Sequence, residues 1–428
     1  MLPVAGDPIR DGAVAVRDGL ITAVGAARDV AAAEPGLPER DLGEAVLLPG
    51  FVDAHCHLEW SLTGGLVNPG VGFAGWLGAL LRLSPGMEEE DFRAAAALGA
   101  LRCLQHGTTT VADSGPTGAA AGALREAGLR GVVHLEVFGR QTGGDARDLA
   151  ARHADRTAAL DADGLVRIGV SPHAPYTVGP ELWAALAGHP ELAGRPWATH
   201  LAESPDESRL LATGDGPLAD LFAERGTAPG AWPGAGGPVT RLHAAGALRP
   251  GLVAAHCVQL GRGDAELLAA AGVGVAHCPV SNARLGCGRA PLAGLRAAGV
   301  AVGLGTDSPA SAGAFDVREE ARACGAAHHA DDPHSPAALV ALATRGGAEA
   351  LGLADLVGTL EVGKRADVVA VLPAAASGDP SADVIAGGAV ELVMVDGELV
   401  VDAGQAVRID AAEVEARARR SRERRTSR

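Results

Sequence analysis

Lysine is almost absent from this chain, because Lys364 is the only lysine among its 36 basic residues. Chemistry that needs a lysine amine is therefore confined to one position. Aromatic residues are also scarce, at 3% of 428 residues, with Tyr176 as the single tyrosine. The core must be built from Ala, Val and Leu, and a hydrophobic content of 47% excludes global disorder.

Several function classes are excluded by other absences. The six cysteines form no CxxC pair, which argues against a disulfide scaffold in a chain of this length. No apolar run reaches the roughly 18 residues of a membrane span, and the first residues do not resemble a signal peptide. The net charge of -16 repels phosphate backbones and anionic membranes. We therefore expect a soluble, cytoplasmic protein with a small-molecule partner, no nucleic acid and no membrane, and a homodimer is an assembly open to it.

The two ends of the chain differ in pattern from the long region between them. Residues 13–24 contain two apolar, β-branched runs around Asp18-Gly19, which is a strong signal for a two-residue hairpin. Segments 366–372 and 390–402 repeat this hairpin style. Strand-only segments therefore flank a region of different architecture.

In the middle region, short apolar strands alternate about eight times with Ala/Leu-rich amphipathic stretches. The expected strands are 48–54, 108–112, 131–137, 166–171, 197–201, 252–256, 273–277 and 301–306. This alternation predicts an α/β fold with a (β/α)8 TIM barrel, and a doubly wound open sheet is the alternative. No GxGxxG follows the first strand to support a dinucleotide-binding version of that alternative.

Two further segments interrupt this pattern. The Gly/Pro-rich stretch 214–240 is interpreted as a loop insertion over one barrel end, with a short helix near 218–225. The arginine-rich tail 411–428 is interpreted as a solvated, fraying helix, with a binding arm as the second interpretation.

Histidines and one aspartate follow the expected strands where those strands end. Since a barrel gathers its strand carboxyl ends on one face, these side chains should converge in space. His55 and His57 stand at i and i+2, on the same side of a strand, and can share a metal ion. The set at strand ends is His55, His57, His173, His200, His256, His277 and Asp307.

The remaining histidines are interpreted as structural. His106 is expected to support the second barrel strand. The others, given a core or surface role, are His134, His153, His189, His243, His328, His329 and His334.

Motifs along nearly the whole chain resemble the amidohydrolase superfamily. They include PGFVDAHCHLEWS (49–61), HGTTTVAD (106–113), SPHAPYTV (171–178), THLAES (199–204), AHCV (255–258), HCPVSNARLGCG (277–288), LGTDS (304–308) and VGTLEVGKRADVVAV (357–371). The set is similar to the branch of chlorotriazine hydrolases, guanine and cytosine deaminases, and methylthioadenosine/adenosylhomocysteine deaminases. The resemblance implies a composite β-sandwich from 1–48 and 359–410 beside a metal-dependent barrel at 49–358, followed by the tail.

The resemblance also implies a mechanism. Two-metal relatives bridge their ions with a carboxylated barrel lysine, but Lys364 lies outside the barrel region. We therefore expect one divalent metal ion, zinc with iron and manganese as alternatives. Its ligands are expected to be His55, His57, His200 and Asp307.

Catalytic roles follow from the same comparison. Asp307 is expected to take a proton from the metal-activated water. Glu203 is expected to protonate the substrate ring and the leaving amine. His256 is expected to hydrogen-bond the water or the tetrahedral centre, and His277 to orient Asp307 or the water from behind.

The substrate is predicted from the flanking motifs. In nucleoside-processing relatives the histidine that matches His173 contacts the ribose, and the motifs look most like aminodeoxyfutalosine deaminases of menaquinone biosynthesis. The 5′ carboxyphenyl group of that substrate requires an arginine, for which Arg82, Arg140 and Arg284 are candidates. The resemblance leaves other substrates and activities open. These are adenosine, methylthioadenosine or adenosylhomocysteine deamination, cytosine or guanine deamination, chlorohydrolase-type hydrolysis, and a non-enzymatic homologue.

The chain departs from adenosylhomocysteine-type relatives at one position. Those proteins place a ribose-binding glutamate shortly after the motif that reads Trp76-Leu77 here, whereas this chain has no acid until Glu88. We expect Glu59 or another group to take that role, or the ribose to be held differently.

Overall fold

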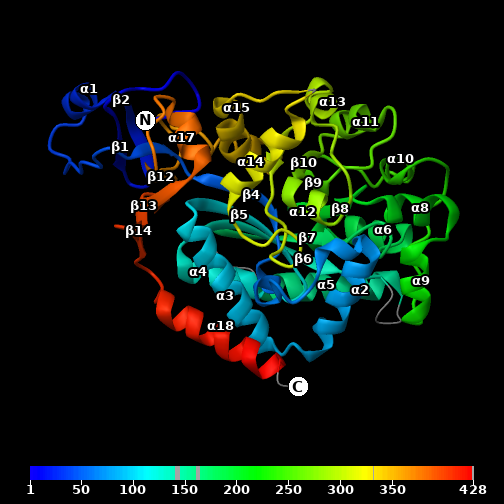
Figure 1. The fold of residues 1–428 in the computed structure, drawn as a ribbon. Coiled ribbons are helices and arrows are strands. Elements are labelled where there is room, and N and C mark those ends of the chain that lie inside the picture. Colours follow the sequence, from blue (N-terminus) through cyan, green and yellow to red (C-terminus); the bar gives the residue numbers. More distant parts are fainter. Residues whose placement is uncertain (140–144, 161–163, 331, 427–428) are drawn as a thin grey trace.

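The computed structural model describes residues 1–139, 145–160, 164–330 and 332–426, and its centre is a parallel eight-stranded sheet (Figure 1). Neighbours in this sheet follow the order of the chain. A parallel bridge between Cys56 and Asp307 joins the first strand to the end of the last. The predicted (β/α)8 barrel is confirmed. Its strands are β4 (Phe51–Cys56), β5 (Thr108–Gly115), β6 (Arg130–Val137), β7 (Val166–Pro172), β8 (Trp197–Leu201), β9 (Leu252–His256), β10 (Gly274–His277) and β11 (Val302–Leu304).

Helices surround the barrel, and each predicted amphipathic stretch contains helix. The helices on and around the barrel are α2 (Phe73–Leu83), α3 (Glu89–Gln105), α4 (Ala119–Ala127), α5 (Ala146–Leu160), α6 (Pro180–Gly188), α7 (Pro190–Ala193), α8 (Pro205–Thr213), α9 (Pro217–Glu224), α10 (Pro238–Ala244), α11 (Asp264–Ala270), α12 (Pro279–Arg284), α13 (Leu292–Ala297), α14 (Val317–His328), α15 (Pro336–Ala341) and α16 (Gly347–Ala350). Among the described residues, no helix is long and apolar enough to cross a membrane.

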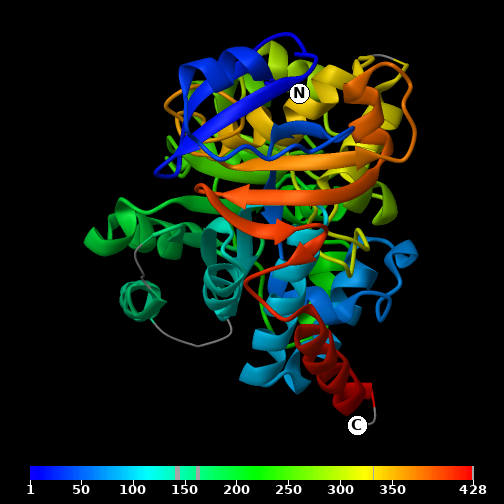
Figure 2. The same cartoon turned by 90° about the vertical axis from the view of Figure 1, so that its left-hand side faces the viewer.

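Both ends of the chain build antiparallel sheet, stacked beside the barrel (Figure 2). The N-terminal hairpin pairs β1 with β2, and the larger sheet has the order β15-β14-β13-β12-β3. Ile21 of the hairpin shares one buried cluster with Leu47 and Leu392 of the larger sheet. The strands are β1 (Gly12–Arg17), β2 (Leu20–Ala26), β3 (Val46–Pro49), β12 (Val368–Pro373), β13 (Gly388–Val395), β14 (Glu398–Asp402) and β15 (Gln405–Ala406), and α1 (Ala27–Ala33) and α17 (Pro380–Ala386) lie beside them.

The junction between sheet and barrel lies at Gly50. The sequence predicts one strand from 48 to 54, but the structure divides it into β3, in the terminal sheet, and β4, in the barrel. A Cβ atom at position 50 would lie 2.1 Å from the Thr109 side chain, so only glycine fits there. The chain thus crosses between the two sheets at this residue.

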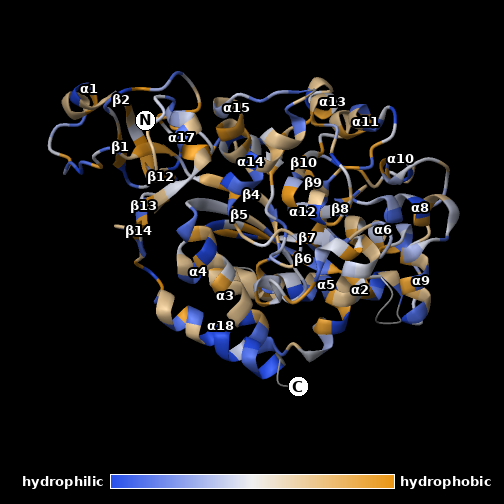
Figure 3. Ribbon diagram, in the orientation of Figure 1, coloured by the Kyte–Doolittle hydropathy of each residue, from blue (hydrophilic) through white to orange (hydrophobic). Residues whose placement is uncertain are grey.

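The arginine-rich tail forms helix α18 (Ala411–Thr426), which lies against α3. The predicted helix is confirmed, but it is not simply solvated. Val414 and Ala418 are buried, and Arg424 donates to Asp91 Oδ1 at 2.9 Å. Figure 3 shows a largely hydrophilic surface along the rest of α18.

Candidate active site

The carboxyl ends of the barrel strands carry the residues of the predicted metal site. His55 belongs to β4 and His57 follows it, while His200 and His256 belong to β8 and β9. Asp307 follows β11 with a φ of 54°, and His256 has a φ of 72°. Positive φ is costly for residues with a Cβ and often marks functional sites, where it aims a side chain. All five side chains are buried.

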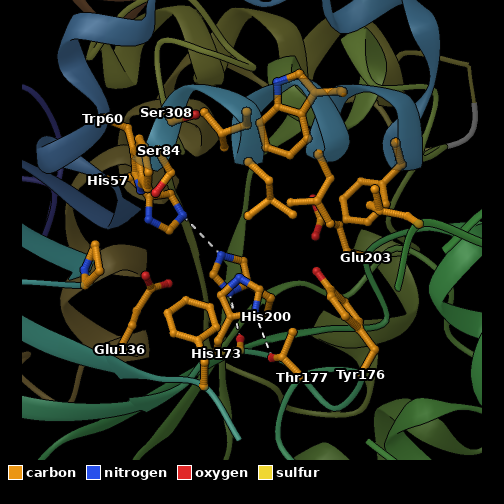
Figure 4. A pocket seen from close by; sticks show the side chains of 18 of the residues that line it. His57, Trp60, Ser84, Glu136, His173, Tyr176, Thr177, His200, Glu203 and Ser308 are labelled. Atoms are coloured by element: carbon orange, nitrogen blue, oxygen red, sulfur yellow. Dashed lines mark hydrogen bonds between the residues drawn. The ribbon is translucent and has the colours of Figure 1, made fainter. Parts of the chain in front are cut away.

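The tautomers of His57 and His200 indicate a cation between them. His57 Nδ1 lies 2.6 Å from the Ser114 carbonyl oxygen, and His200 Nδ1 lies 2.8 Å from the His173 carbonyl oxygen. A carbonyl only accepts, so both Nδ1 atoms carry the proton and both Nε2 atoms present a lone pair. These two Nε2 atoms are 3.1 Å apart (Figure 4). Two facing lone pairs repel unless a positive charge lies beside them.

His55 and Asp307 complete this donor set. Asp307 Oδ1 lies 3.4 Å from His57 Nε2 and 4.0 Å from His55 Nε2. His55 Nε2 is buried without a hydrogen-bond partner in the described part of the chain. Burial and the neighbouring histidines lower the pKa of His55 well below its usual value, so its ring is neutral and free to coordinate. Three imidazole nitrogens and one carboxylate suit zinc and also iron or manganese.

Hydroxyl groups, rather than His277, hold Asp307 in place. Ser281 Oγ and Ser311 Oγ both donate to Asp307 Oδ2, the latter at 2.8 Å. Neither ring nitrogen of His277 has a hydrogen-bond partner among the described residues. His277 therefore makes no hydrogen bond to Asp307, which was one of its two expected roles, and its expected contact with the water stays a prediction. Ser281 had no signal beyond its place in the 277–288 motif, and Ser311 lies outside the motifs.

Glu203 lies on the substrate side of this donor set. Its Oε1 atom is 3.6 Å from His256 Nε2, while His256 Nδ1 is 3.0 Å from Asn282 Oδ1. Burial, followed by the charges of Asp307 and Glu207, raises the pKa of Glu203 well above its usual value. A raised pKa favours the protonated carboxyl group, which can act as an acid.

Glu207 is a positioning residue that the sequence does not reveal. Its carboxylate accepts from the backbone N–H of Glu203 at 2.7 Å and of Ala202 at 3.2 Å. Ala202 has a φ of 52°, so this turn is strained, and the carboxylate holds it. Burial raises the pKa of Glu207 to about 7.

A cavity of about 280 Å³ opens over the donor set, and its lining includes several aromatic side chains (Figure 4). The chain has five Trp, one Tyr and six Phe in total. Two of the tryptophans, the tyrosine and four of the phenylalanines line this cavity, so scarce residues are concentrated here. They are Trp60, Trp76, Tyr176, Phe73, Phe92, Phe138 and Phe222.

His173 and Glu136 also line the cavity. His173 Nδ1 lies 2.9 Å from Thr177 Oγ1, and burial lowers the pKa of this histidine to about 3, so the ring is neutral. Burial raises the pKa of Glu136 to about 8. Glu59, the acid that the sequence suggested for the ribose, does not line the cavity and instead accepts from Thr117. Glu136 is the acid that the sequence missed.

The arginines predicted to bind the substrate carboxylate do not line the cavity where the structure describes them. Arg82 and Arg284 do not line the cavity, and Arg284 instead donates to the Ala312 carbonyl at 2.6 Å, so both predictions are wrong for this cavity. Arg140 lies outside the described residues. Arg225, just after α9 in the predicted insertion, lines the cavity and is exposed to solvent.

Comparisons with known proteins agree with this architecture. Residues 46–400 match the sequence profile of the amidohydrolase family. A 5-methylthioadenosine/S-adenosylhomocysteine deaminase of Pelotomaculum thermopropionicum is 32% identical, over 96% of this chain and 93% of its own. A protein of the same description from Nitratidesulfovibrio vulgaris is 33% identical, over 85% of this chain and 79% of its own.

Solved structures give the same result. A zinc-bound adenosine deaminase of Xanthomonas campestris has a TM-score of 0.84 at 28% identity, covering 99% of this chain and 96% of its own. A zinc complex of the atrazine chlorohydrolase of Arthrobacter aurescens has a TM-score of 0.78 at 25% identity, covering 97% and 96%. The chain therefore belongs to the amidohydrolase family, as a hydrolase of carbon–nitrogen bonds of the deaminase type.

Proposed function

We propose that the chain is a metal-dependent deaminase of a 6-aminopurine nucleoside whose 5′ side carries an aromatic carboxylate, with aminodeoxyfutalosine of menaquinone biosynthesis as the substrate. The observation that carries this proposal is the cavity wall. In a chain with 3% aromatic residues, most aromatic side chains line one cavity, and Arg225 stands among them. Aromatic walls stack on a purine and on an aryl group, and a guanidinium pairs with a carboxylate.

His55, His57, His200 and Asp307 are the residues that would hold the divalent metal ion. The two facing Nε2 atoms, the unpartnered His55 Nε2 and the nearby carboxylate fit such an ion. When bound, a divalent ion lowers the pKa of an attached water toward about 7 and so supplies a nucleophile at neutral pH.

The chain's own residues move the protons. Asp307 takes a proton from the attacking water, whose oxygen adds to C6 of the purine. Glu203, which enters protonated, donates its proton to ring nitrogen N1 and then passes the proton of the new C6 hydroxyl to the amino group. The proton held by Asp307 restores Glu203 to its protonated state. Breakage of the C6–N bond releases ammonia and leaves the 6-oxo product. His256 lies 3.6 Å from Glu203 and faces the same oxygen as it adds to C6.

Two cavity residues are assigned to the sugar. His173, fixed by Thr177 in its neutral form, offers Nε2 to a ribose hydroxyl. Glu136, at the end of the neighbouring strand β6 on the same side of the cavity (Figure 4), can hydrogen-bond to ribose hydroxyls where adenosylhomocysteine-type relatives use another glutamate.

The second candidate is deamination of 5′-methylthioadenosine or S-adenosylhomocysteine, which the 32–33% identical relatives favour. Both candidates share the same metal chemistry and differ in the 5′ group. S-adenosylhomocysteine carries an amino acid group on its 5′ side, whereas the first candidate carries an aryl group. The aromatic side chains of the cavity wall favour the aryl group, and therefore the first candidate.

The test is a comparison of kcat/KM for ammonia release with the zinc-loaded protein. Aminodeoxyfutalosine, adenosine, 5′-methylthioadenosine and S-adenosylhomocysteine are compared side by side. We expect aminodeoxyfutalosine to be fastest. Arg225→Ala should reduce that advantage by about 10-fold, because a charge-assisted hydrogen bond is worth about 1.5–3 kcal/mol and this one is exposed.

Arg82→Ala is the matched control, because Arg82 is a nearby exposed arginine that does not line the cavity. A highest rate with S-adenosylhomocysteine would support the second candidate. Faster turnover of cytosine or guanine than of any nucleoside would contradict both.

A further inference from the structure

A second group of potential metal ligands lies outside the catalytic cavity. His277 ends β10, and Cys324 and His328 stand on α14 at i and i+4, so the helix presents both on one face. One ligand atom of each residue lies within 4.8 Å of the others. The three residues are 1%, 0% and 2% exposed.

Among these three residues, His277 is notable because its buried ring lacks the hydrogen bonds that such a group normally makes. A neutral imidazole has one N–H donor and one lone pair, and both ring nitrogens of His277 lack a hydrogen-bond partner in the described chain. Buried polar groups are normally paired. The edge-to-face packing on His328, with ring centroids 5.7 Å apart, fills space but satisfies neither nitrogen.

We propose that His277, Cys324 and His328 bind a second divalent metal ion, zinc by the chemistry of its donors, at a site distinct from the catalytic one. A thiolate with two imidazoles is a donor set typical of zinc. The catalytic donor set contains no sulfur, so the two sites differ in their ligand chemistry. This proposal does not depend on the substrate proposed above.

A route for the ion and its fourth ligand lies beside the cluster. A cavity of about 240 Å³ is bordered by the 289–294 segment, His328 and Asp332. A water from this cavity can complete a tetrahedral set. Cysteine coordinates zinc as the thiolate, so binding of the ion would release the thiol proton of Cys324.

The site would also fasten α14 to the barrel near Asp307. Glu320 of α14 accepts from the Val280 backbone N–H at 3.0 Å, at the start of α12. The next residue, Ser281, donates to Asp307. A metal that holds α14 on β10 would thus stabilise the helix that positions one catalytic carboxylate.

The test uses cobalt as the probe metal. The full chain is stripped with a chelator, reloaded with Co²⁺, and its metal content and near-ultraviolet absorption are measured. We expect two cobalt ions per chain and a thiolate-to-cobalt charge-transfer band. Cys324→Ala should bind one ion, lose the band and keep deaminase activity. His57→Ala should bind one ion and keep the band but lose activity.

Cys103→Ala is the matched control, since Cys103 is another fully buried thiol, on α3, and it should behave as wild type. One ion per chain with no band in the wild-type protein would overturn the proposal, as would a band that persists in Cys324→Ala. If Cys324→Ala does not fold, alkylation of Cys324 in the wild-type chain decides the matter. Zinc should protect this thiol from the reagent, and equal labelling with and without zinc would equally overturn the proposal.

Discussion

The catalytic cluster and the β10–α14 cluster of His277, Cys324 and His328 are both buried groups of metal-binding side chains, but they are built differently. In the first, the second nitrogen of His57 and of His200 is bonded to a backbone carbonyl. In the second, His277 has no such partner among the described residues. Such outer hydrogen bonds orient ligands before the metal arrives. We therefore expect the catalytic ligands to be preorganised, whereas the β10–α14 cluster depends on its ion for order.

The largest expected effect is a loss of activity, and only mutation of the catalytic cluster should cause it. His57→Ala removes one nitrogen from the facing pair and should lower kcat/KM by about 10³-fold or more, because the ion contributes several kcal/mol to transition-state stabilisation. Metal content should fall by one ion per chain, measured by elemental analysis. Wild-type activity in this variant would show that the ion is held elsewhere.

The next effect separates proton transfer from metal binding within the catalytic cluster. Glu203→Gln keeps size and hydrogen bonding but cannot deliver a proton, so kcat should fall by about 10²–10⁴-fold. Metal content should equal that of the wild type. Loss of the ion together with activity would show that Glu203 is a ligand.

The convergence of the proposed ligands could be predicted because these residues follow the regular geometry of the barrel. Parallel strands end on one face, so His55, His200 and Asp307 could be placed together from strand positions alone. The aromatic cavity wall could not be foreseen in this way. Its side chains come from separate elements, such as α2 and α9, whose placement over the barrel end does not follow from the strand order, and they meet only in the folded chain.

The β10–α14 cluster escaped sequence analysis for a related reason. His328 was interpreted as structural, and Cys324 belongs to no CxxC pair. The i, i+4 spacing of these two residues carries a metal signal only when a third ligand from a distant strand faces the same side of the helix. Arg225 was missed similarly, because its insertion has no fixed relation to the barrel.

A smaller effect concerns the substrate rather than the ion. His173→Ala should lower kcat/KM for nucleosides by about 2- to 12-fold, since a hydrogen bond between neutral groups is worth about 0.5–1.5 kcal/mol. Turnover of adenine as a bare base should change much less. The ion should stay bound, because His200 is held by the backbone carbonyl of His173 and not by its ring. An equal loss for nucleoside and base would contradict the ribose assignment.

The last expected effect is on stability and concerns the β10–α14 cluster alone. Free zinc at about 100 times the Kd stabilises a folded protein by about 2.7 kcal/mol per site. In the His57→Ala background the catalytic site no longer contributes, so the zinc-dependent rise in unfolding free energy should report the second site. Adding Cys324→Ala should abolish that rise, whereas adding Cys103→Ala should leave it intact. Both cysteine variants lose a similar buried side chain, so their zinc-free stabilities should fall by comparable amounts, and only the zinc-dependent part distinguishes them. Denaturant unfolding with and without zinc measures both parts, and an equal zinc response in the two double variants would show that α14 holds no ion.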